Sequence, residues 1–266
     1  MPKQQNKTIV LFDLDGTLTE ARKEIDLSLL VEPLEKLIRV SEIGILTGSG
    51  LNYVQEQAAP LFPFHRLMEK MHILPCNGTE YFAPIMKLVH STDMSENLGE
   101  LKFESLMKNI IELQLQCIEK FDIPLTGHFV DFRGSMINWC PIGRNASQEQ
   151  RNRFKEMDKS LGIREEFLSL LRKEIENNKI EGITAVLGGN TSFDIYPDNW
   201  DKTYALQHFE DYDVYFVGDR CEENGNDYEV CKVLGERCFA VKSPEDTAKL
   251  INETLLPMLT DCPDCN

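Results

Sequence analysis

The stretch Thr8-Ile9-Val10-Leu11-Phe12-Asp13-Leu14-Asp15-Gly16-Thr17-Leu18-Thr19, near the start of the chain, decides the fold. Its apolar half has the length and character of a strand that is buried on both faces in a parallel sheet. Asp13 and Asp15 then lie at the carboxyl end of this strand, the edge of an α/β sheet where ligands bind. Because two like charges so placed repel unless they share a cation, the pattern predicts a divalent metal site, most simply for Mg²⁺. One of the carboxylates would remain available for covalent chemistry.

Composition and charge limit the classes of protein and partner. The 266 residues are 42% hydrophobic, enough for one large domain or two smaller ones. The 28 basic and 44 acidic residues give a formal net charge of -16, which argues against nucleic acid or an anionic membrane as a partner. No apolar run approaches the roughly 20 residues of a membrane span, and residues 1–7 lack the apolar segment of a signal peptide. We therefore expect a cytoplasmic protein.

The eight cysteines are scattered along the chain, except for Cys262 and Cys265 in the tail. Scattered cysteines in a cytosolic chain are expected to be mostly reduced thiols. The tail spacing Cys-Pro-Asp-Cys is similar to redox and half-zinc motifs, but no second pair of Cys or His lies near it. We expect the tail motif to be inert.

The two ends of the chain alternate strands and helices. An amphipathic helix is predicted over residues 28–39 and a buried strand over residues 43–46, so that the first strand begins a βαβ unit. Near the other end, a helix is predicted to begin at Lys202 and a buried strand to cover residues 214–217. This order is typical of a parallel sheet covered by helices.

The middle of the chain has a different pattern, with antiparallel strand pairs between long amphipathic helices. The expected helices cover residues 101–121, 147–159 and 164–177, and the expected strands cover residues 127–133, 136–140, 184–187 and 193–196. We therefore predict an α/β fold with a Rossmann-like parallel-sheet core that is interrupted by an inserted α+β cap domain. Residues 1–86 and 200–266 form the predicted core, and residues 87–199 form the predicted cap.

Hydroxyl and glycine residues follow the second predicted strand as Thr47-Gly48-Ser49-Gly50. Free backbone N–H groups and a helix dipole converge at such a strand-to-helix turn, which favours phosphate binding by Thr47 and Ser49. The alternative is an ordinary turn in which Ser49 caps the next helix.

An acidic loop follows the strand predicted at residues 214–217. It begins at Gly218-Asp219 and continues to Asn226-Asp227. Together with Asp13 and Asp15, these side chains supply enough oxygen ligands for Mg²⁺. The alternative for the loop alone is a solvated turn.

Taken together, these motifs resemble those of the haloacid-dehalogenase-like phosphotransferases. The resemblance implies that Asp13 is the nucleophile that becomes phosphorylated and that Asp15 is the general acid and base. It implies that Thr47 or Ser49, with Lys202, contacts the transferring phosphoryl group. The implied Mg²⁺ ligands are Asp13, Asp15, Asp219, Asn226 and Asp227.

A more specific resemblance extends over nearly the whole chain. Four motifs, Phe132-Arg133, Pro141-Ile142-Gly143-Arg144, Gly188–Asp194 and Asn199-Trp200-Asp201-Lys202, are similar to those of eukaryotic phosphomannomutases, as are Ser147–Arg151 and Ser243–Thr247. The positions that match that family's sugar-phosphate-binding residues are Arg22, Arg133, Arg144, Arg151, Ser192 and Asp194. Taken singly, each arginine could equally be a solvated surface charge.

The chain departs from the family pattern at two positions. Cys76 stands where the family has a Glu, and Val233 stands where the family has an Asp of a second cation site. The second cation site is therefore in doubt, whereas the primary Mg²⁺ ligands and the sugar-phosphate residues are all present.

The resemblance implies interconversion of mannose 6-phosphate and mannose 1-phosphate through an aspartyl phosphate and a hexose 1,6-bisphosphate, which also activates the enzyme. The product would feed GDP-mannose synthesis, and the chain would form a homodimer through the cap. Two alternatives stay open: a sugar-phosphate phosphatase of the same superfamily, and a catalytically silent binding homologue. The sequence does not decide between mannose and glucose as the preferred sugar.

Overall fold

The structure, a computed structural model, describes residues 7–223 and 225–260, so the tail motif of Cys262 and Cys265 lies outside the described residues. The chain divides into two compact units. The first comprises the residues up to Ser91 and those from Trp200 onward, and the second is Thr92–Asn199. The second joint lies where the sequence predicts it. The first joint lies after residue 91 instead of residue 86, because residues 87–91 form a strand of the first unit's sheet.

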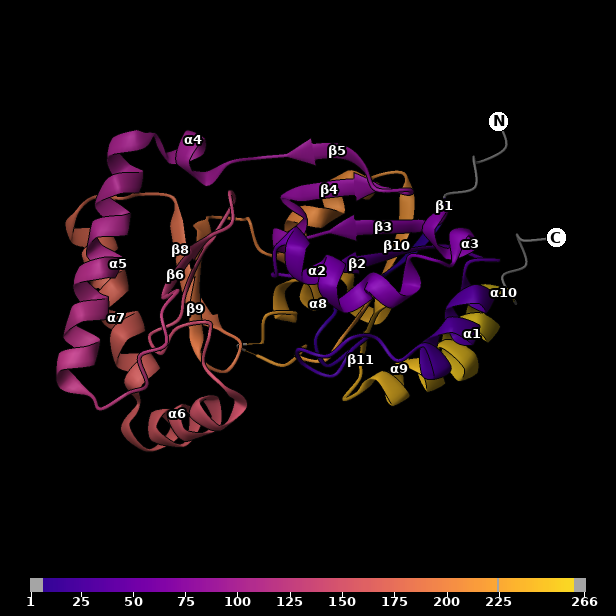
Figure 1. Cartoon of the computed structure of the whole chain (residues 1–266). Coiled ribbons are helices and arrows are strands. Elements are labelled where there is room, and N and C mark those ends of the chain that lie inside the picture. Colours follow the sequence, from indigo (N-terminus) through magenta and orange to yellow (C-terminus); the bar gives the residue numbers. More distant parts are fainter. Residues whose placement is uncertain (1–6, 224, 261–266) are drawn as a thin grey trace. The chain divides into compact units, whose positions relative to one another are not determined.

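A seven-stranded sheet in the order β11-β10-β1-β2-β3-β4-β5 forms the centre of the first unit (Figure 1). Neighbours from β11 to β3 are parallel, whereas β4 pairs antiparallel with both β3 and β5. The predicted α/β class with a parallel-sheet core is confirmed. The strands are β1 (Lys7–Phe12), β2 (Glu42–Leu46), β3 (Met71–Leu74), β4 (Glu80–Ala83), β5 (Lys87–Ser91), β10 (Tyr212–Gly218) and β11 (Cys238–Ala240).

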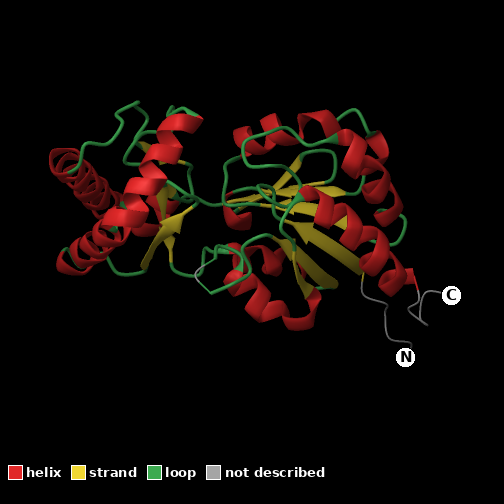
Figure 2. Cartoon of the chain, turned by 90° about the horizontal axis from the view of Figure 1, so that it is seen from below, coloured by secondary structure: helices red, strands yellow, loops and turns green. Residues whose placement is uncertain are grey.

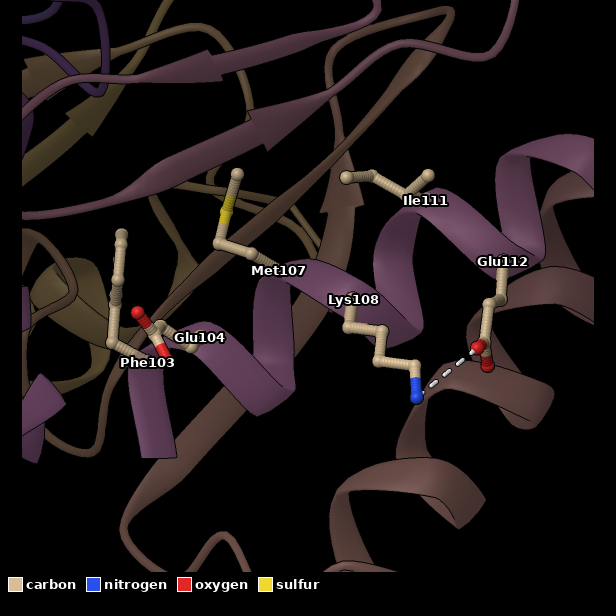
Figure 3. Close-up of a pocket in the computed structure, with 6 residues that line it drawn as sticks. All are labelled: Phe103, Glu104, Met107, Lys108, Ile111 and Glu112. Carbon is tan, nitrogen blue, oxygen red and sulfur yellow. Dashed lines mark ion pairs between the residues drawn. The ribbon is translucent and has the colours of Figure 1, made fainter. Parts of the chain in front are cut away.

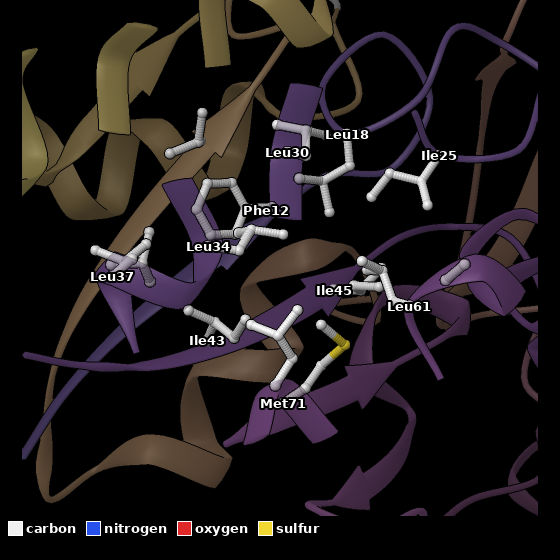
Figure 4. Packing of buried hydrophobic residues seen from close by; sticks show 14 of the residues in the cluster. Phe12, Leu18, Ile25, Leu30, Leu34, Leu37, Ile43, Ile45, Leu61 and Met71 are labelled. Carbon is white, nitrogen blue, oxygen red and sulfur yellow. The ribbon is translucent and has the colours of Figure 1, made fainter. Parts of the chain in front are cut away.

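Strand β1 lies at the centre of this sheet and pairs with β10 and β2. Alternate side chains of a strand point to opposite faces, and those of β1 enter two separate cores. Val10 and Phe12 pack in one cluster, part of which Figure 4 shows, and Ile9 and Leu11 pack in the other. Helices cover both faces (Figure 2), which explains why β1 is apolar without alternation.

Short helices make up the rest of the first unit. The segment after Lys202, predicted to be a helix, is a 3₁₀ helix that Asp201 caps by accepting a hydrogen bond from Thr203 N. The α-helices are α1 (Leu27–Leu37), α2 (Leu51–Ala58), α3 (His65–Met68), α8 (Tyr228–Leu234), α9 (Pro244–Leu250) and α10 (Leu256–Thr260). The 3₁₀ helices are η1 (Ala59–Leu61), η2 (Cys76–Gly78), η3 (Lys202–Phe209) and η4 (Gly235–Arg237), and a π-helical segment, η5 (Ile251–Leu255), joins α9 to α10.

The second unit is an antiparallel sheet with helices packed against it, as the predicted α+β pattern requires. Its strands, in the order β6-β7-β9-β8, are β6 (Val130–Phe132), β7 (Ile137–Trp139), β8 (Ile183–Gly188) and β9 (Ser192–Pro197). Its helices are α4 (Met94–Leu98), α5 (Glu100–Lys120), α6 (Gln148–Leu161) and α7 (Ile163–Asn177). Helices α5 and α7 lie side by side (Figure 1). No helix among the described residues is both long and apolar enough to span a membrane.

One covalent feature differs from the expectation of reduced cysteines. Cys231 in α8 and Cys238 in β11 form a disulfide, because the chain reverses direction through η4 and brings these residues to a Cα–Cα distance of 5.1 Å. The cysteines that lie outside this disulfide, among the described residues, are Cys76, Cys117, Cys140 and Cys221.

The packing of α1 predicts the effect of a core truncation. Leu30 is fully buried, whereas Leu27 of the same helix is 36% exposed. We expect Leu30→Ala to lower the free energy of unfolding by about 2–5 kcal/mol, because the surrounding core cannot close the cavity completely. We expect Leu27→Ala to change it by no more than about 1 kcal/mol. Urea unfolding followed by circular dichroism measures both, and equal midpoints for the two variants would contradict the packing described.

Candidate active site

Asp13 occupies the first position after β1, and its N–H donates to the carbonyl of Val217 in β10 (2.9 Å). The sheet order changes direction at β1, since β2 lies on one side and β10 on the other. The carboxyl ends of β1 and β10 therefore bring Asp13 and Asp219 to the point where α/β sheets bind ligands. Carboxylate oxygens of Asp13, Asp219 and Asp227 all lie within 4.8 Å of one another.

Lys202 neutralises part of this negative charge. Its Nζ lies 2.5 Å from Asp13 Oδ1 and 2.5 Å from Asp227 Oδ1, and its side chain is only 1% exposed. Asp227 is fixed further by the N–H of Arg220, which donates to its second oxygen (3.1 Å). Charged groups so deeply buried are stable only when they are paired in this way.

The electrostatics of this cluster favour a further cation. Burial raises the pKa of Asp13 to about 7, and the carboxylates of Asp227 and Asp219 raise it as well, against the opposing effect of Lys202. Burial and Asp227 similarly raise the pKa of Asp219 to about 6. Burial alone would lower the pKa of Lys202, but Asp13 and Asp227 raise it above its ordinary value. The carboxylates therefore have too little positive charge near them to stay fully ionised. The ammonium group of Lys202, in contrast, is already stabilised by its two carboxylate partners.

Two glycines allow the carboxylates to approach the backbone. A Cβ at Gly16, which has a φ of +83°, would lie 2.3 Å from Asp219 Oδ2. A Cβ at Gly218 would lie 2.4 Å from Asp227 Oδ2. Any side chain at either position would displace a carboxylate, so the cluster depends on both glycines.

The residues present fit Mg²⁺. Asp13, Asp219 and Asp227 carry three negative charges when ionised, and Lys202 carries one positive charge, so a divalent cation would balance the cluster. Carboxylate oxygens are the ligands that Mg²⁺ prefers. Of the predicted ligands, the structure brings these three aspartates together, whereas the side chain of Asp15 makes other contacts and Asn226 is exposed on the loop.

Asp15 is held by two donors instead. Its Oδ1 accepts a hydrogen bond from the hydroxyl of Tyr53 in α2 (2.7 Å) and another from the backbone N–H of Arg22 (3.0 Å). The Arg22 side chain itself is exposed. Burial and the nearby Asp15 raise the pKa of Tyr53, so the phenol remains a hydrogen-bond donor.

Thr47 and Ser49 form a turn that is fixed at both ends. Thr47 Oγ1 accepts from Ser49 N (3.1 Å), and Thr47 O accepts from Asn77 N (2.8 Å). Gly50 is the N-cap of α2 and no side chain caps it, so the alternative in which Ser49 caps this helix is wrong.

Cys76, at a position where the sequence departs from the family pattern, donates its N–H to Ser49 O (2.9 Å). Val233, the other departure, is 61% exposed on α8.

In the second unit, Asp131 gathers positively charged side chains. Its Oδ2 lies 2.9 Å from Nε of Arg133 and 3.4 Å from Nε of Arg144, and its Oδ1 lies 3.3 Å from Nε2 of His128. Partial burial would raise the pKa of Asp131, but the two guanidinium groups lower it below its usual value. A single carboxylate therefore orients both arginines.

Asn138 connects this cluster to β9. Its side chain accepts a hydrogen bond from Arg144 Nη1 (2.7 Å) and donates to Asp194 (2.6 Å) and Ser192 (3.1 Å). Ser192 and Asp194 are alternate residues of β9 and share a face, as predicted. Asp131, Asn138 and Asp194 are register partners across β6, β7 and β9, which places the whole network on one face of the sheet.

Arg151 lies beneath this network. It is 8% exposed, and its guanidinium donates to Ala146 O (3.0 Å), Arg144 O (2.6 Å) and Thr191 Oγ1 (2.8 Å). Arg151 therefore holds the backbone of the Arg144 loop against the turn before β9.

Sequence reasoning missed three residues that organise the site: Tyr53, Asp131 and Asn138. Asp131 had a usable signal, because it lies two residues before Arg133 on a predicted strand and therefore faces the same side. Tyr53 contacts Asp15, which is 38 positions away along the chain, and Asn138 contacts Arg144, which is 6 positions away. No local sequence pattern indicates either contact.

Comparison with known proteins shows the family of the chain. The family model of eukaryotic phosphomannomutase matches residues 30–257. A phosphomannomutase from Saccharomyces cerevisiae is 38% identical over 257 residues, which cover 94% of this chain and 95% of that protein. A phosphomannomutase from Spinacia oleracea is 37% identical over 254 residues, which cover 93% and 96%.

Solved structures show the same fold. An IMP-bound IMP-nucleotidase from Plasmodium falciparum aligns with a TM-score of 0.60 at 17% identity, over 93% of this chain and 68% of that one. A haloacid dehalogenase-like hydrolase from Bacteroides thetaiotaomicron aligns with a TM-score of 0.56 at 16% identity, over 92% and 98%. The haloacid-dehalogenase-like fold is confirmed, and from the family match and the identity to its relatives the chain belongs to the eukaryotic phosphomannomutase family.

Proposed function

We propose that this chain is a phosphomannomutase that interconverts mannose 6-phosphate and mannose 1-phosphate and so supplies mannose 1-phosphate for GDP-mannose synthesis. The observation that carries the proposal is the cluster of the buried Asp13, Lys202 and Asp227 with the partly buried Asp219, in a chain that matches its relatives over more than nine-tenths of its length. A catalytically silent homologue would not need to retain this costly arrangement of buried charges.

Asp13 is the proposed nucleophile. A carboxylate is a weak nucleophile towards phosphorus, so the reaction requires charge neutralisation at the phosphoryl oxygens. Lys202 provides part of this neutralisation next to Asp13, and Thr47 and Ser49 would supply hydroxyl groups. Asp15 would remove the proton from the attacking sugar hydroxyl in one half-reaction and return it in the other. Tyr53 and the Arg22 N–H bind its Oδ1, which leaves Oδ2 for proton transfer.

Asp13, Asp219 and Asp227 would hold Mg²⁺, with Asp15 and Asn226 as the remaining predicted ligands. When bound, Mg²⁺ would supply the positive charge that the transferring phosphoryl group requires.

The arginines of the second unit would bind the phosphate that does not react. Planar guanidinium groups bind phosphate in a bidentate manner, and Asp131 and Asn138 hold Arg133 and Arg144 in fixed directions. Arg22 of the first unit is proposed as a further phosphate ligand. Ser192 and Asp194 would contact sugar hydroxyls, and the buried Arg151 would act by holding the Arg144 loop.

A hexose 1,6-bisphosphate carries a phosphate at each end, and it would both activate the enzyme and form during the cycle.

We propose that the enzyme works in the cytoplasm and has no nucleic-acid or membrane partner. The net charge of -16 supports this proposal, because nucleic acid and anionic membranes repel such a surface.

A homodimer through the second unit is supported by an apolar stripe along α5. Phe103, Met107 and Ile111 follow one another at four-residue spacing and line a shallow hollow on the helix surface (Figure 3). Ile111 is 58% exposed, and Leu115 extends the stripe at 53% exposure. Glu104, Lys108 and Glu112 flank it with both signs of charge. Such a stripe suits an isologous contact, in which the same patch of two copies pairs about a two-fold axis.

The activity is tested by ³¹P NMR of the purified chain with mannose 1-phosphate, a hexose 1,6-bisphosphate and Mg²⁺. We expect mannose 6-phosphate to form, and we expect Asp13→Asn to lower the rate at least about 1,000-fold, because an amide cannot be phosphorylated. Removal of Mg²⁺ with a chelator should abolish turnover, and Asp211→Asn, at an exposed position, serves as control. Formation of inorganic phosphate without mannose 6-phosphate would identify a phosphatase, and an active Asp13→Asn variant would disprove the role of the nucleophile. Glucose 1-phosphate in parallel measures the sugar preference.

The guanidinium fork of Arg144 predicts a binding effect. We expect Arg144→Lys to raise KM for mannose 1-phosphate about tenfold with a smaller change in kcat, since it loses one charge-assisted hydrogen bond and keeps its charge. Arg153→Lys is the matched control, because Arg153 lies in the same unit, 57% exposed and paired with Asp122. Steady-state kinetics measures both variants, and equal KM values would refute the proposed phosphate contact.

The stripe on α5 predicts the oligomeric state. We expect the parent chain to be a dimer by light scattering and Ile111→Glu to be a monomer, because a dimer would bury the new charges without partners. Leu161→Glu, at a 55% exposed position of α6, should leave the dimer intact. A monomeric parent, or a dimeric Ile111→Glu variant, would show that the stripe is not the interface.

A further inference from the structure

Three cysteines lie together in the first unit, apart from the carboxylate cluster. The Sγ atoms of Cys221, Cys231 and Cys238 are all within 4.8 Å of one another. Cys231 and Cys238 share the disulfide, and the Cys221 Sγ lies 3.8 Å from that of Cys238. All three residues are partly exposed, so that solutes can reach them.

Regular structure fixes where these side chains begin. Cys221 follows β10, Cys238 is the first residue of β11, and the two strands are parallel neighbours with Phe216 opposite Cys238. Cys231 lies in α8, which contacts both strands. The Cys221 thiol also donates to Gly218 O at 3.5 Å. The backbone of β10, α8 and β11 therefore brings these three cysteines close together.

We propose that, once the disulfide is reduced, Cys221, Cys231 and Cys238 bind one thiophilic d¹⁰ cation of the Zn²⁺ class. A dithiol reductant supplies two electrons and two protons to open the Cys231–Cys238 bond and is itself oxidised to a disulfide. The cation then displaces the three sulfur-bound protons into solvent and forms three metal–sulfur bonds. Water occupies its fourth position. The proposal does not depend on the mutase activity.

The spacing of the sulfurs agrees with this coordination. Zn–S bonds of about 2.3 Å in a tetrahedral site place sulfur atoms about 3.8 Å apart, the distance between Cys221 and Cys238. Reduction lets Cys231 and Cys238 separate to non-bonded contact by side-chain rotation. Because thiolates prefer soft or borderline cations and carboxylates prefer hard ones, the cysteines and the aspartates would select different metals in the same unit.

The test uses Cd²⁺ as the probe, since its thiolate complexes absorb in the ultraviolet. The full chain carries Cys262→Ser and Cys265→Ser, so that the tail motif cannot contribute, and excess Mg²⁺ is present to occupy the carboxylates. After reduction and anaerobic removal of the dithiol, we expect one Cd²⁺ to bind per chain with the charge-transfer intensity of three thiolates. Zn²⁺ should displace it.

Single substitutions identify the ligands. In the same background, Cys221→Ser and Cys238→Ser should each weaken Cd²⁺ binding more than tenfold and remove a third of the band. Cys117→Ala, which deletes a free buried thiol of the second unit, should change neither. The proposal is wrong if the reduced parent binds no Cd²⁺, if Cys221→Ser binds as the parent does, or if peptide mapping finds Cys231 and Cys238 still bonded after reduction.

Discussion

The whole first unit depends on keeping three carboxylates and one ammonium group together at the carboxyl ends of two adjacent strands. Burying these charges costs several kcal/mol for each ion unless pairing offsets it. The pairing requires Lys202 to be buried between Asp13 and Asp227, and it requires glycine at positions 16 and 218. These ion pairs and close contacts fix how near the acidic loop that begins at Asp219 lies to the end of β1. The remaining excess of negative charge suits the cluster to a cation, which is also what the proposed phosphoryl transfer requires.

The second unit also holds its charged side chains in place by pairing them, but the sign of the excess charge is reversed. There the excess charge is positive, and Asp131 and Asn138 hold Arg133 and Arg144 in defined directions. An acidic protein can bind anionic sugars only if it concentrates its arginines locally. Asp131 lowers the electrostatic attraction for phosphate and in return fixes the geometry of the donors. In the proposed cycle the bisphosphate is released and rebound, so a phosphate-binding site of moderate strength suits it better than a tight one.

The sequence predicts those parts of the fold that local patterns determine. Continuous apolar runs predict β1, β2 and β10, and helical periodicity predicts α1, α5, α6 and α7. Strands β3, β5 and β11 were not predicted: β11 has three residues, and the side chains of β5 are largely exposed. Asp13 and Asp219, which are proposed to act in catalysis and metal binding, could be selected from the sequence because each directly follows a buried strand. Tyr53, Asn138 and the disulfide escaped prediction because they depend on distances between segments, which no spacing along the chain encodes.

The position of β1 also sets the order in which the protein can form during synthesis. Lys7 of β1 pairs with Tyr212 of β10, and Thr247 of α9 donates a hydrogen bond to Thr17 O in the catalytic loop (2.7 Å). Residues 92–199 are contiguous, so the second unit can fold while the first is still incomplete. Until translation has passed β10, one edge of the largely apolar β1 lacks its neighbour, which exposes the nascent chain to aggregation. Asp13, the proposed nucleophile, is thus among the first residues to be made and among the last to reach its final surroundings.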